Sequence, residues 1–156
     1  MTMAVGALAQ TATVLEKDGY RIPVSDFSGI EPYLHTTSDT TFVIDLWATW
    51  CIPCVQGLPS LLKLDSAYSG KKVKVILVNI DKKSTAAETL IPFLKKRNIK
   101  TKVLLMSDMD QDSWIPKIDP SWDGSIPITI IFNKDKRKFY AYDLTYPELT
   151  GELEKF

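Results

Sequence analysis

The feature that most constrains this chain is an apolar run that leads directly into a pair of cysteines. Residues 41–49 are TFVIDLWAT, and residues 50–54 continue as WCIPC. A continuous apolar run of this length predicts a strand that is buried on both faces and so lies centrally in a sheet. Apolar residues at helical spacing then predict a helix over residues 52–68. We therefore expect a central strand to end, and a helix to begin, at Cys51.

The remainder of the chain predicts alternating strands and helices. Residues 14–24 contain the turn sequence KDGY and predict a β-hairpin ahead of the central strand. Residues 84–97 predict a helix with Ser84 as its N-cap. The other expected elements are strands at 73–80 and 103–106, a hairpin of 126–132 with 138–142, and short helices at 30–34, within 108–119 and at 146–156. This order predicts an α/β domain with a central mixed β-sheet flanked by helices and an N-terminal β-hairpin extension.

Length and composition argue against several classes of protein. The 156 residues suit a single domain, which we place at residues 11–156. Nineteen basic and nineteen acidic side chains leave no net charge, which disfavours nucleic-acid binding through phosphate contacts. Two cysteines and one histidine are too few for a tetrahedral zinc site, so no metal is expected. No apolar run approaches the roughly 20 residues that span a bilayer.

The first ten residues predict where the protein is located. Residues 1–10 are apolar and rich in small side chains, and Ala-Leu-Ala occupies positions 7–9. This pattern is typical of the end of a secretory signal peptide cleaved after Ala9, although no basic residue precedes it. We therefore expect residues 1–10 to be a signal-peptide remnant and the protein to be periplasmic or otherwise extracytoplasmic. A frayed N-terminal segment is the alternative interpretation, and a cytoplasmic protein is the alternative location.

The position of the two cysteines predicts thiol–disulfide chemistry. A helix N-terminus carries unsatisfied N–H groups and partial positive charge, which lower the pKa of a thiol placed there. Cys51 is thus the expected nucleophile, and Cys54, one turn further along, is placed to resolve a mixed disulfide. Pro53 in the first turn interrupts no helical hydrogen bond. Half of a zinc site and two inert core thiols are the alternatives. The number of possible zinc ligands disfavours the first, and the order strand–CxxC–helix disfavours the second.

These motifs together resemble the thioredoxin superfamily. The segment from Phe42 to Cys54 is similar to its strand-to-helix signature, and WCIPC is similar to its W-C-x-x-C active site. Pro59 matches the proline that kinks the active-site helix, and Pro127, ahead of the strand ITIIF, matches the cis-proline that faces the cysteines. The sequence WATWC and the expected hairpin are most similar to the extracytoplasmic TlpA/ResA-type branch. The resemblance implies a thioredoxin-like fold and a dithiol oxidoreductase that needs no cofactor.

Asp45 is an acid within the apolar run, six residues before Cys51. The resemblance implies that it is the buried acid that lies near the second cysteine in thioredoxins. Burial raises the pKa of a carboxyl group, so we expect Asp45 to accept the proton of Cys54 during release of the partner. Thioredoxins carry a lysine near this acid, whereas the matching position here is Leu77. A surface acid at a strand edge is the alternative, which the apolar neighbours of Asp45 disfavour.

The resemblance also implies a face that holds the substrate. In the superfamily, the backbone of the residue before the cis-proline pairs with an extended substrate peptide. Ile126 and Pro127 are therefore candidate substrate contacts, and we expect the peptide bond between them to be cis. Trp50, Ile52 and Pro53, which flank the first cysteine, complete the expected substrate-binding set.

The expected activity is reduction of disulfide bonds in other proteins by the dithiol form of Cys51 and Cys54. The expected partners are protein thiols or disulfides and an upstream thiol reductant, through which any membrane contact is made; a monomer is expected. Oxidases and isomerases of the superfamily usually carry histidine between the cysteines, where this chain has Ile52 and Pro53. A dithiol oxidase or isomerase, and a redox-inert peptide-binding module, are the alternatives.

Overall fold

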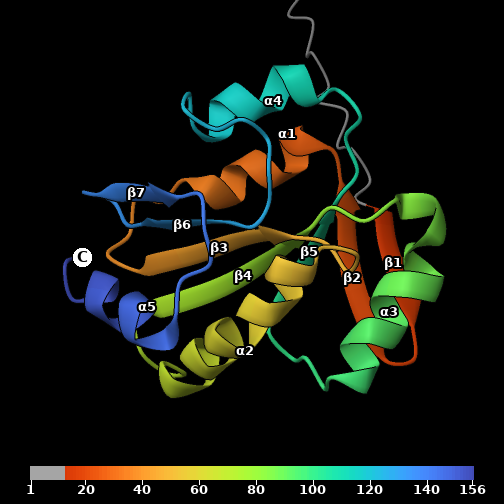
Figure 1. Ribbon diagram of the computed structural model, residues 1–156, viewed down its shortest axis with the longest axis horizontal. Helices are drawn as coiled ribbons and strands as arrows, with labels where there is room; N and C mark the ends of the chain where they lie inside the picture. Colours follow the sequence, from red (N-terminus) through yellow and green to blue (C-terminus); the bar gives the residue numbers. More distant parts are fainter. Residues whose placement is uncertain (1–12) are drawn as a thin grey trace, which may run out of the picture.

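A seven-stranded sheet with helices on both faces makes up residues 13–156, which are the residues that the computed structural model describes (Figure 1). The expected signal-peptide remnant, residues 1–10, lies outside the described residues. The strands are β1 (Thr13–Lys17), β2 (Tyr20–Ser25), β3 (Thr41–Trp47), β4 (Val73–Asn79), β5 (Lys102–Met106), β6 (Ile128–Phe132) and β7 (Arg137–Tyr140). The helices are α1 (Phe27–Ile30), α2 (Ile52–Ala67), α3 (Ala86–Lys96), α4 (Gln111–Ile118) and α5 (Tyr146–Leu153), with 3-10 turns η1 (Glu31–Leu34) and η2 (Lys83–Thr85). Within residues 13–156, none of the helices combines the length and the apolar character that crossing a membrane requires.

The strand order β1-β2-β5-β4-β3-β6-β7 makes the sheet mixed. The run β2-β5-β4-β3 is parallel, whereas β1–β2, β3–β6 and β6–β7 are antiparallel pairs. The apolar strand β3 is paired on both sides, which confirms its predicted central position. The β1–β2 turn contains Asp18 and Gly19, whose φ angles of 52° and 83° are the left-handed backbone that tight hairpins require. A mixed sheet flanked by helices confirms the α/β class predicted from the sequence.

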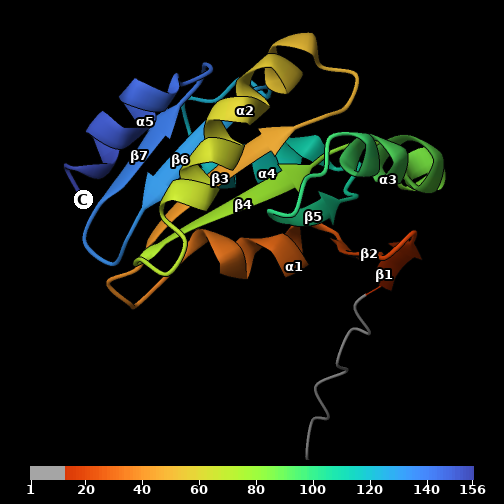
Figure 2. The same cartoon turned by 90° about the horizontal axis from the view of Figure 1, so that it is seen from below.

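Two apolar layers hold the helices on the sheet, because successive side chains of a strand point to opposite faces. Val43 and Trp47 of β3 belong to the layer under α2, α3 and α5, whereas Ile44 and Leu46 belong to the layer with α1 and α4. Figure 2 shows α2 and α5 on one side of the sheet and α1 on the other. The same alternation places Asp45 on the face of Val43 and Trp47. Asp45 therefore points toward the helix that carries the second cysteine.

Several element boundaries differ from the predictions by a few residues, and two of the differences have a clear physical reason. The helix predicted from Ser84 begins at Ala86, because the preceding residues form the separate turn η2. Ser84 is therefore not the N-cap; Thr85 occupies that position without a side-chain hydrogen bond. β6 begins at Ile128 rather than two residues earlier, since Pro127 has no N–H to donate to a neighbouring strand.

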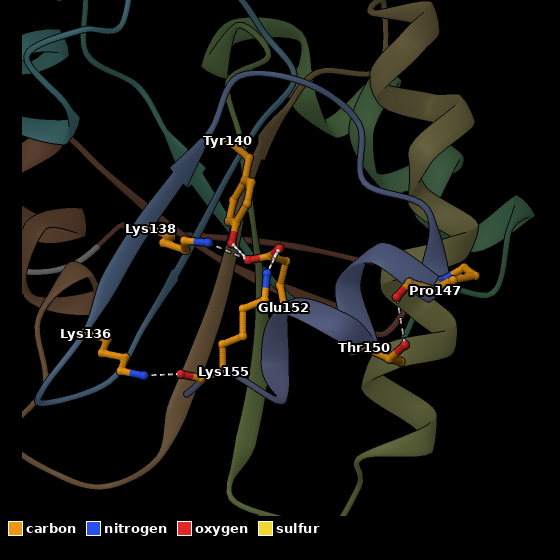
Figure 3. Close-up of polar contacts among 7 residues, drawn as sticks. All are labelled: Lys136, Lys138, Tyr140, Pro147, Thr150, Glu152 and Lys155. Atoms are coloured by element: carbon orange, nitrogen blue, oxygen red, sulfur yellow. Dashed lines mark hydrogen bonds and ion pairs between the residues drawn. The ribbon is translucent and has the colours of Figure 1, made fainter.

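Helix α5 is joined to β7 through one glutamate. Glu152 accepts hydrogen bonds from Lys155, Tyr140 and Lys138 (Figure 3). The ammonium nitrogens of Lys155 and Lys138 lie 2.8 and 3.0 Å from its carboxylate oxygens. These three donors lower the pKa of Glu152 from 4.5 to about 2. Lys136 adds a hydrogen bond to the backbone carbonyl of Lys155, so β7 and the end of α5 form one polar network.

We expect Glu152→Gln to lower the free energy of unfolding near pH 7 by about 0.5–1.5 kcal/mol, because an uncharged amide accepts weaker hydrogen bonds. The pKa of Glu152 is about 2 in the folded protein and about 4.5 in the unfolded chain, so this stabilisation is present above pH 4.5 and is lost as the pH falls toward 2. Urea unfolding at pH 7 and pH 3 measures the difference. Glu154→Gln, at an exposed glutamate just beyond α5, is the control, and equal losses for both substitutions at pH 7 would contradict the prediction.

Candidate active site

The two cysteines lie where β3 passes into α2. Cys51 is the N-cap of α2, and its Sγ accepts a hydrogen bond from the backbone N–H of Cys54 at 3.3 Å. The two side chains form a disulfide, with their Cα atoms 5.2 Å apart. Cys51 is 6% exposed and Cys54 1%, so the first cysteine is the more accessible. In the dithiol form, the helix N-terminus stabilises a thiolate at Cys51 more than one at the buried Cys54.

A loop from the last third of the chain faces Cys51. The Ile126–Pro127 peptide bond is cis, as predicted, and the carbonyl oxygen of Ile126 lies 3.9 Å from Cys51 Sγ. Trp122 holds this loop by donating from Nε1 to the Ser125 carbonyl oxygen at 2.7 Å. The fold thus brings together two segments that are 75 residues apart in the chain.

Asp45 is buried in register with Leu77 of β4 and Thr129 of β6. Burial raises the pKa of Asp45 well above its usual value. The Thr129 hydroxyl donates a hydrogen bond to Oδ1 at 3.1 Å and lowers the pKa, whereas the charge of Asp143 raises it further. Leu77 supplies no positive charge to offset the burial. Burial thus disfavours the charged form of Asp45. An acid perturbed in this way is a candidate for proton exchange with a neighbouring group.

An exposed apolar rim surrounds Cys51. Trp50 and Ile52 are 67% and 72% exposed on either side of it. A groove of about 800 Å³ extends from Cys51 between η2, the loop before α4 and the loop before Pro127, and Trp114 of α4 lines its wall. A cluster of exposed apolar side chains next to a groove is typical of a site that binds another molecule.

Sequence reasoning missed Asp81, which holds the loop ahead of the cysteines. Its carboxylate accepts hydrogen bonds from the N–H of Thr49 at 2.9 Å and from the Thr49 hydroxyl at 2.6 Å. The N–H of Asp81 in turn donates to Asn79 Oδ1 at 2.8 Å. Because Thr49 lies two residues before Cys51, Asp81 ties the loop that carries Cys51 to the end of β4. The sequence does contain a signal for Asp81, because it is an acid that comes just after a buried strand. The carboxyl ends of parallel strands meet at one edge of the sheet, so this position places Asp81 near the end of the strand that leads to Cys51.

The acidic segment before α4 serves the fold. Asp108 accepts hydrogen bonds from the backbone N–H groups of Phe27, at 3.0 Å, and Asp110, at 2.9 Å. These bonds attach the start of α4 to the start of α1. Within residues 13–156, no group of three or more histidine, cysteine, aspartate or glutamate side chains is arranged to hold a metal ion.

Comparison with known proteins finds thiol–disulfide enzymes. The model of the Redoxin family matches residues 7–137. The thiol-disulfide oxidoreductase ResA of Bacillus thuringiensis subsp. konkukian (strain 97-27) is 25% identical over 154 residues, which cover 99% of this chain and 77% of ResA. Among solved structures, a DsbF homologue from Corynebacterium diphtheriae has a TM-score of 0.62 at 20% identity, covering 76% of this chain and 73% of its own. A secreted Mycobacterium tuberculosis disulfide oxidoreductase homologous to E. coli DsbE has a TM-score of 0.58 at 19% identity, covering 76% and 84%.

These similarities agree with the geometry of the site. The solved structures share the fold, and the Redoxin match spans both cysteines and Pro127. The predicted membership of the thioredoxin superfamily, with ResA/TlpA-like character, is confirmed. The protein is a thiol–disulfide oxidoreductase of the ResA/thioredoxin type that carries its redox pair at Cys51 and Cys54. Since the family model matches most of its length, the chain belongs to the Redoxin family.

Proposed function

We propose that the protein reduces disulfide bonds in other proteins, in an extracytoplasmic compartment and as a monomer. The observation that carries the proposal is the bond between Cys51 at the head of α2 and Cys54 one turn inside it, beside an exposed apolar rim. A redox pair with one accessible sulfur can react with a disulfide that another protein presents.

Two features support reduction rather than oxidation. The residues between the cysteines are Ile52 and Pro53, so no imidazolium stabilises a thiolate on Cys51. Asp45 lies buried beside Leu77, so no lysine at position 77 favours the charged form of the Asp45 carboxyl group. A dithiol that the protein stabilises poorly gives up its electrons more readily, because stabilising the reduced form makes a pair more oxidising.

In the proposed reaction the protein begins as the dithiol. The Cys51 thiolate attacks one sulfur of the substrate disulfide, and the other sulfur leaves as a thiolate. The Asp45 carboxylate then takes the proton of Cys54, whose thiolate attacks Cys51 Sγ and expels the second substrate sulfur. Two electrons have passed to the substrate, whose thiolates take up protons from solvent, and the protein is left as the disulfide. An upstream thiol reductant restores the dithiol by the same exchange.

The proposed substrate is a protein segment that lies extended across the first cysteine. The Ile126 carbonyl, 3.9 Å from the sulfur of that cysteine, offers a backbone acceptor with which an added strand can pair. Trp50 and Ile52 offer apolar contact on either side. Pro53 and Pro127 have no N–H that would compete for the substrate's acceptors. These five residues form the proposed substrate-binding set.

Two observations support the proposed compartment. Residues 1–10 resemble the end of a signal peptide. One protein with the same fold is described as a secreted disulfide oxidoreductase. Any contact with a membrane is proposed to occur through the upstream reductant.

Insulin reduction tests the activity. With a small dithiol as reductant, we expect a catalytic amount of the protein to accelerate insulin reduction, and we expect Cys51→Ser and Cys54→Ser each to abolish turnover. Cys54→Ser cannot resolve the mixed disulfide, so it should accumulate an adduct through Cys51 that is visible on a non-reducing gel. The Cys51→Ser variant should accumulate far less of this mixed-disulfide adduct.

The other outcomes separate the alternatives. An adduct that forms preferentially on Cys54 would reverse the roles of the two cysteines. Faster oxidation of a reduced, unfolded protein than reduction of insulin would make the protein an oxidase. Peptide binding without turnover in either direction would make it a binding module.

We expect Asp45→Asn to stabilise the disulfide form at pH 8, because asparagine has nearly the same shape but no charged form whose burial costs free energy; each unit by which burial raises the pKa of Asp45 corresponds to about 1.4 kcal/mol. An unfolded aspartate ionises near pH 4, whereas the pKa of folded Asp45 lies well above this value because the residue is buried. Between the two pKa values the folded state binds more protons, so the wild-type free energy of unfolding falls as the pH rises. Urea unfolding at pH 4 and pH 8 should show a gain that is largest at pH 8. With exposed Asp135→Asn as control, a gain of equal size at both pH values would contradict this prediction.

The same Asp45→Asn substitution tests the proposed proton transfer. Removing a general base typically costs about 10²–10⁴-fold in the step that it assists. We therefore expect slow release of substrate from the mixed disulfide, with the rate of its formation by Cys51 nearly unchanged. Stopped-flow measurement of the two steps separates them, and equal slowing of both would argue for a structural role.

A further inference from the structure

Asp143 lies on the loop between β7 and α5, and its carboxylate rests against α2. A Cβ placed on Gly57 would lie 2.5 Å from Asp143 Oδ1 and 3.0 Å from its Cγ. The loop is fixed near both ends, because Tyr140 donates to Glu152 and Thr145 is the side-chain N-cap of α5. The anchored loop therefore keeps Asp143 next to α2 at Gly57.

Gly57 leaves space for a neighbouring side chain, and its backbone does not adopt a conformation that only glycine favours. It lies inside α2, and among residues 13–156 the glycines with positive φ are Gly19, Gly70 and Gly124. Glycine in a helix interior is less favourable than alanine, so its presence calls for a reason. The atoms that a Cβ would meet belong to Asp143. Glycine at position 57 thus lets the Asp143 carboxylate approach the helix.

This approach places a second acid near the resolving cysteine. Gly57 follows Cys54 by three residues, and residues at that spacing are neighbours on a helix surface. Asp45 points toward the same helix from the sheet below. Asp143 is more exposed than Asp45, and burial nevertheless raises the pKa of its carboxyl group.

The charge of Asp143 acts on Asp45. It raises the pKa of Asp45 beyond the effect of burial, and the Thr129 hydroxyl is the group that lowers it. Leu77, in register on the adjacent strand, carries no charge. Within residues 13–156, Asp143 is thus the ionisable side chain whose charge bears on Asp45.

We propose that Asp143 is a positioning residue of the resolving half of the site, and that its charge controls when Asp45 is free to take the proton of Cys54. This inference rests on the proposed function, in which Asp45 is the base for that step. The Cys54 S–H proton passes to the Asp45 carboxylate, and the Cys54 thiolate displaces the substrate sulfur from Cys51. A charged Asp143 disfavours a second charge on Asp45, so a larger share of Asp45 stays protonated and cannot act as a base.

The test compares the pH dependence of release from the mixed disulfide in four proteins: wild type, Asp143→Asn, Gly57→Ala and Asp135→Asn. We expect Asp143→Asn to move the acidic limb of the profile to lower pH, with release about two- to fivefold faster at a fixed pH on that limb. Gly57→Ala should cause a shift in the same direction, because its methyl group displaces the carboxylate. It also favours the helix, so the variant is expected to fold. Asp135→Asn, which removes an exposed charge from the β6–β7 turn, should leave the profile unchanged.

A direct titration keeps this proposal separate from the proposed function. The carboxyl carbon of Asp45, followed by NMR, should titrate at lower pH in Asp143→Asn than in wild type, and in an Asp45→Asn background Asp143→Asn should leave the release profile unchanged. An unshifted Asp45 titration in Asp143→Asn would overturn the role of Asp143 even where Asp45→Asn slows release. A shifted titration with no effect of Asp45→Asn on release would instead overturn Asp45 as the base, and the role of Asp143 with it.

Discussion

The burial of Asp45 between the sheet and α2 is the constraint on which the rest of the site depends. Its neighbours in register, Leu77 and Thr129, are uncharged, and one hydroxyl donates to its carboxylate. Ionising a carboxyl group in such a place is costly, so its pKa lies well above the usual value. Burying an acid in this way costs stability at pH values where the unfolded chain carries it ionised, and that cost is understandable if the acid exchanges protons with Cys54.

The topology of the sheet decides what meets at the cysteines. Parallel strands β3 and β4 end at one edge, which brings Asp81 to the loop that precedes Cys51. β6 runs antiparallel to β3, so its beginning lies beside the end of β3, and the Ile126 carbonyl reaches the first sulfur. Cys51, Asp81 and the Ile126 carbonyl therefore come together from the ends of three strands that share one edge.

Much of this arrangement is visible in the sequence because its signals are local. An apolar run with a single acid predicts a buried central strand, and CxxC after it predicts a redox pair at the head of a helix. The boundary at Ser84 was wrong because a 3-10 turn and a helix present similar residue patterns over one turn. Asp143 was missed because it acts through a contact with a residue distant in the chain, and an isolated aspartate has no periodicity that predicts its partner. The position of Asp81 after a buried strand predicts the edge of the sheet where it lies but not its hydrogen bonds to Thr49.

The sequence by itself determined the class of fold, through the order of its strands and helices, and the positions of Cys51, Cys54 and the acid at position 45, through spacing within a few residues. The tertiary structure alone decided which groups surround them. It placed Asp143 over Gly57, Asp81 under the Thr49 loop and Ile126 beside Cys51, and it settled how deeply Asp45 is buried. The physical reason is that charge, pKa and accessibility depend on distances in space, which strand pairing and helix packing set only when the whole chain has folded.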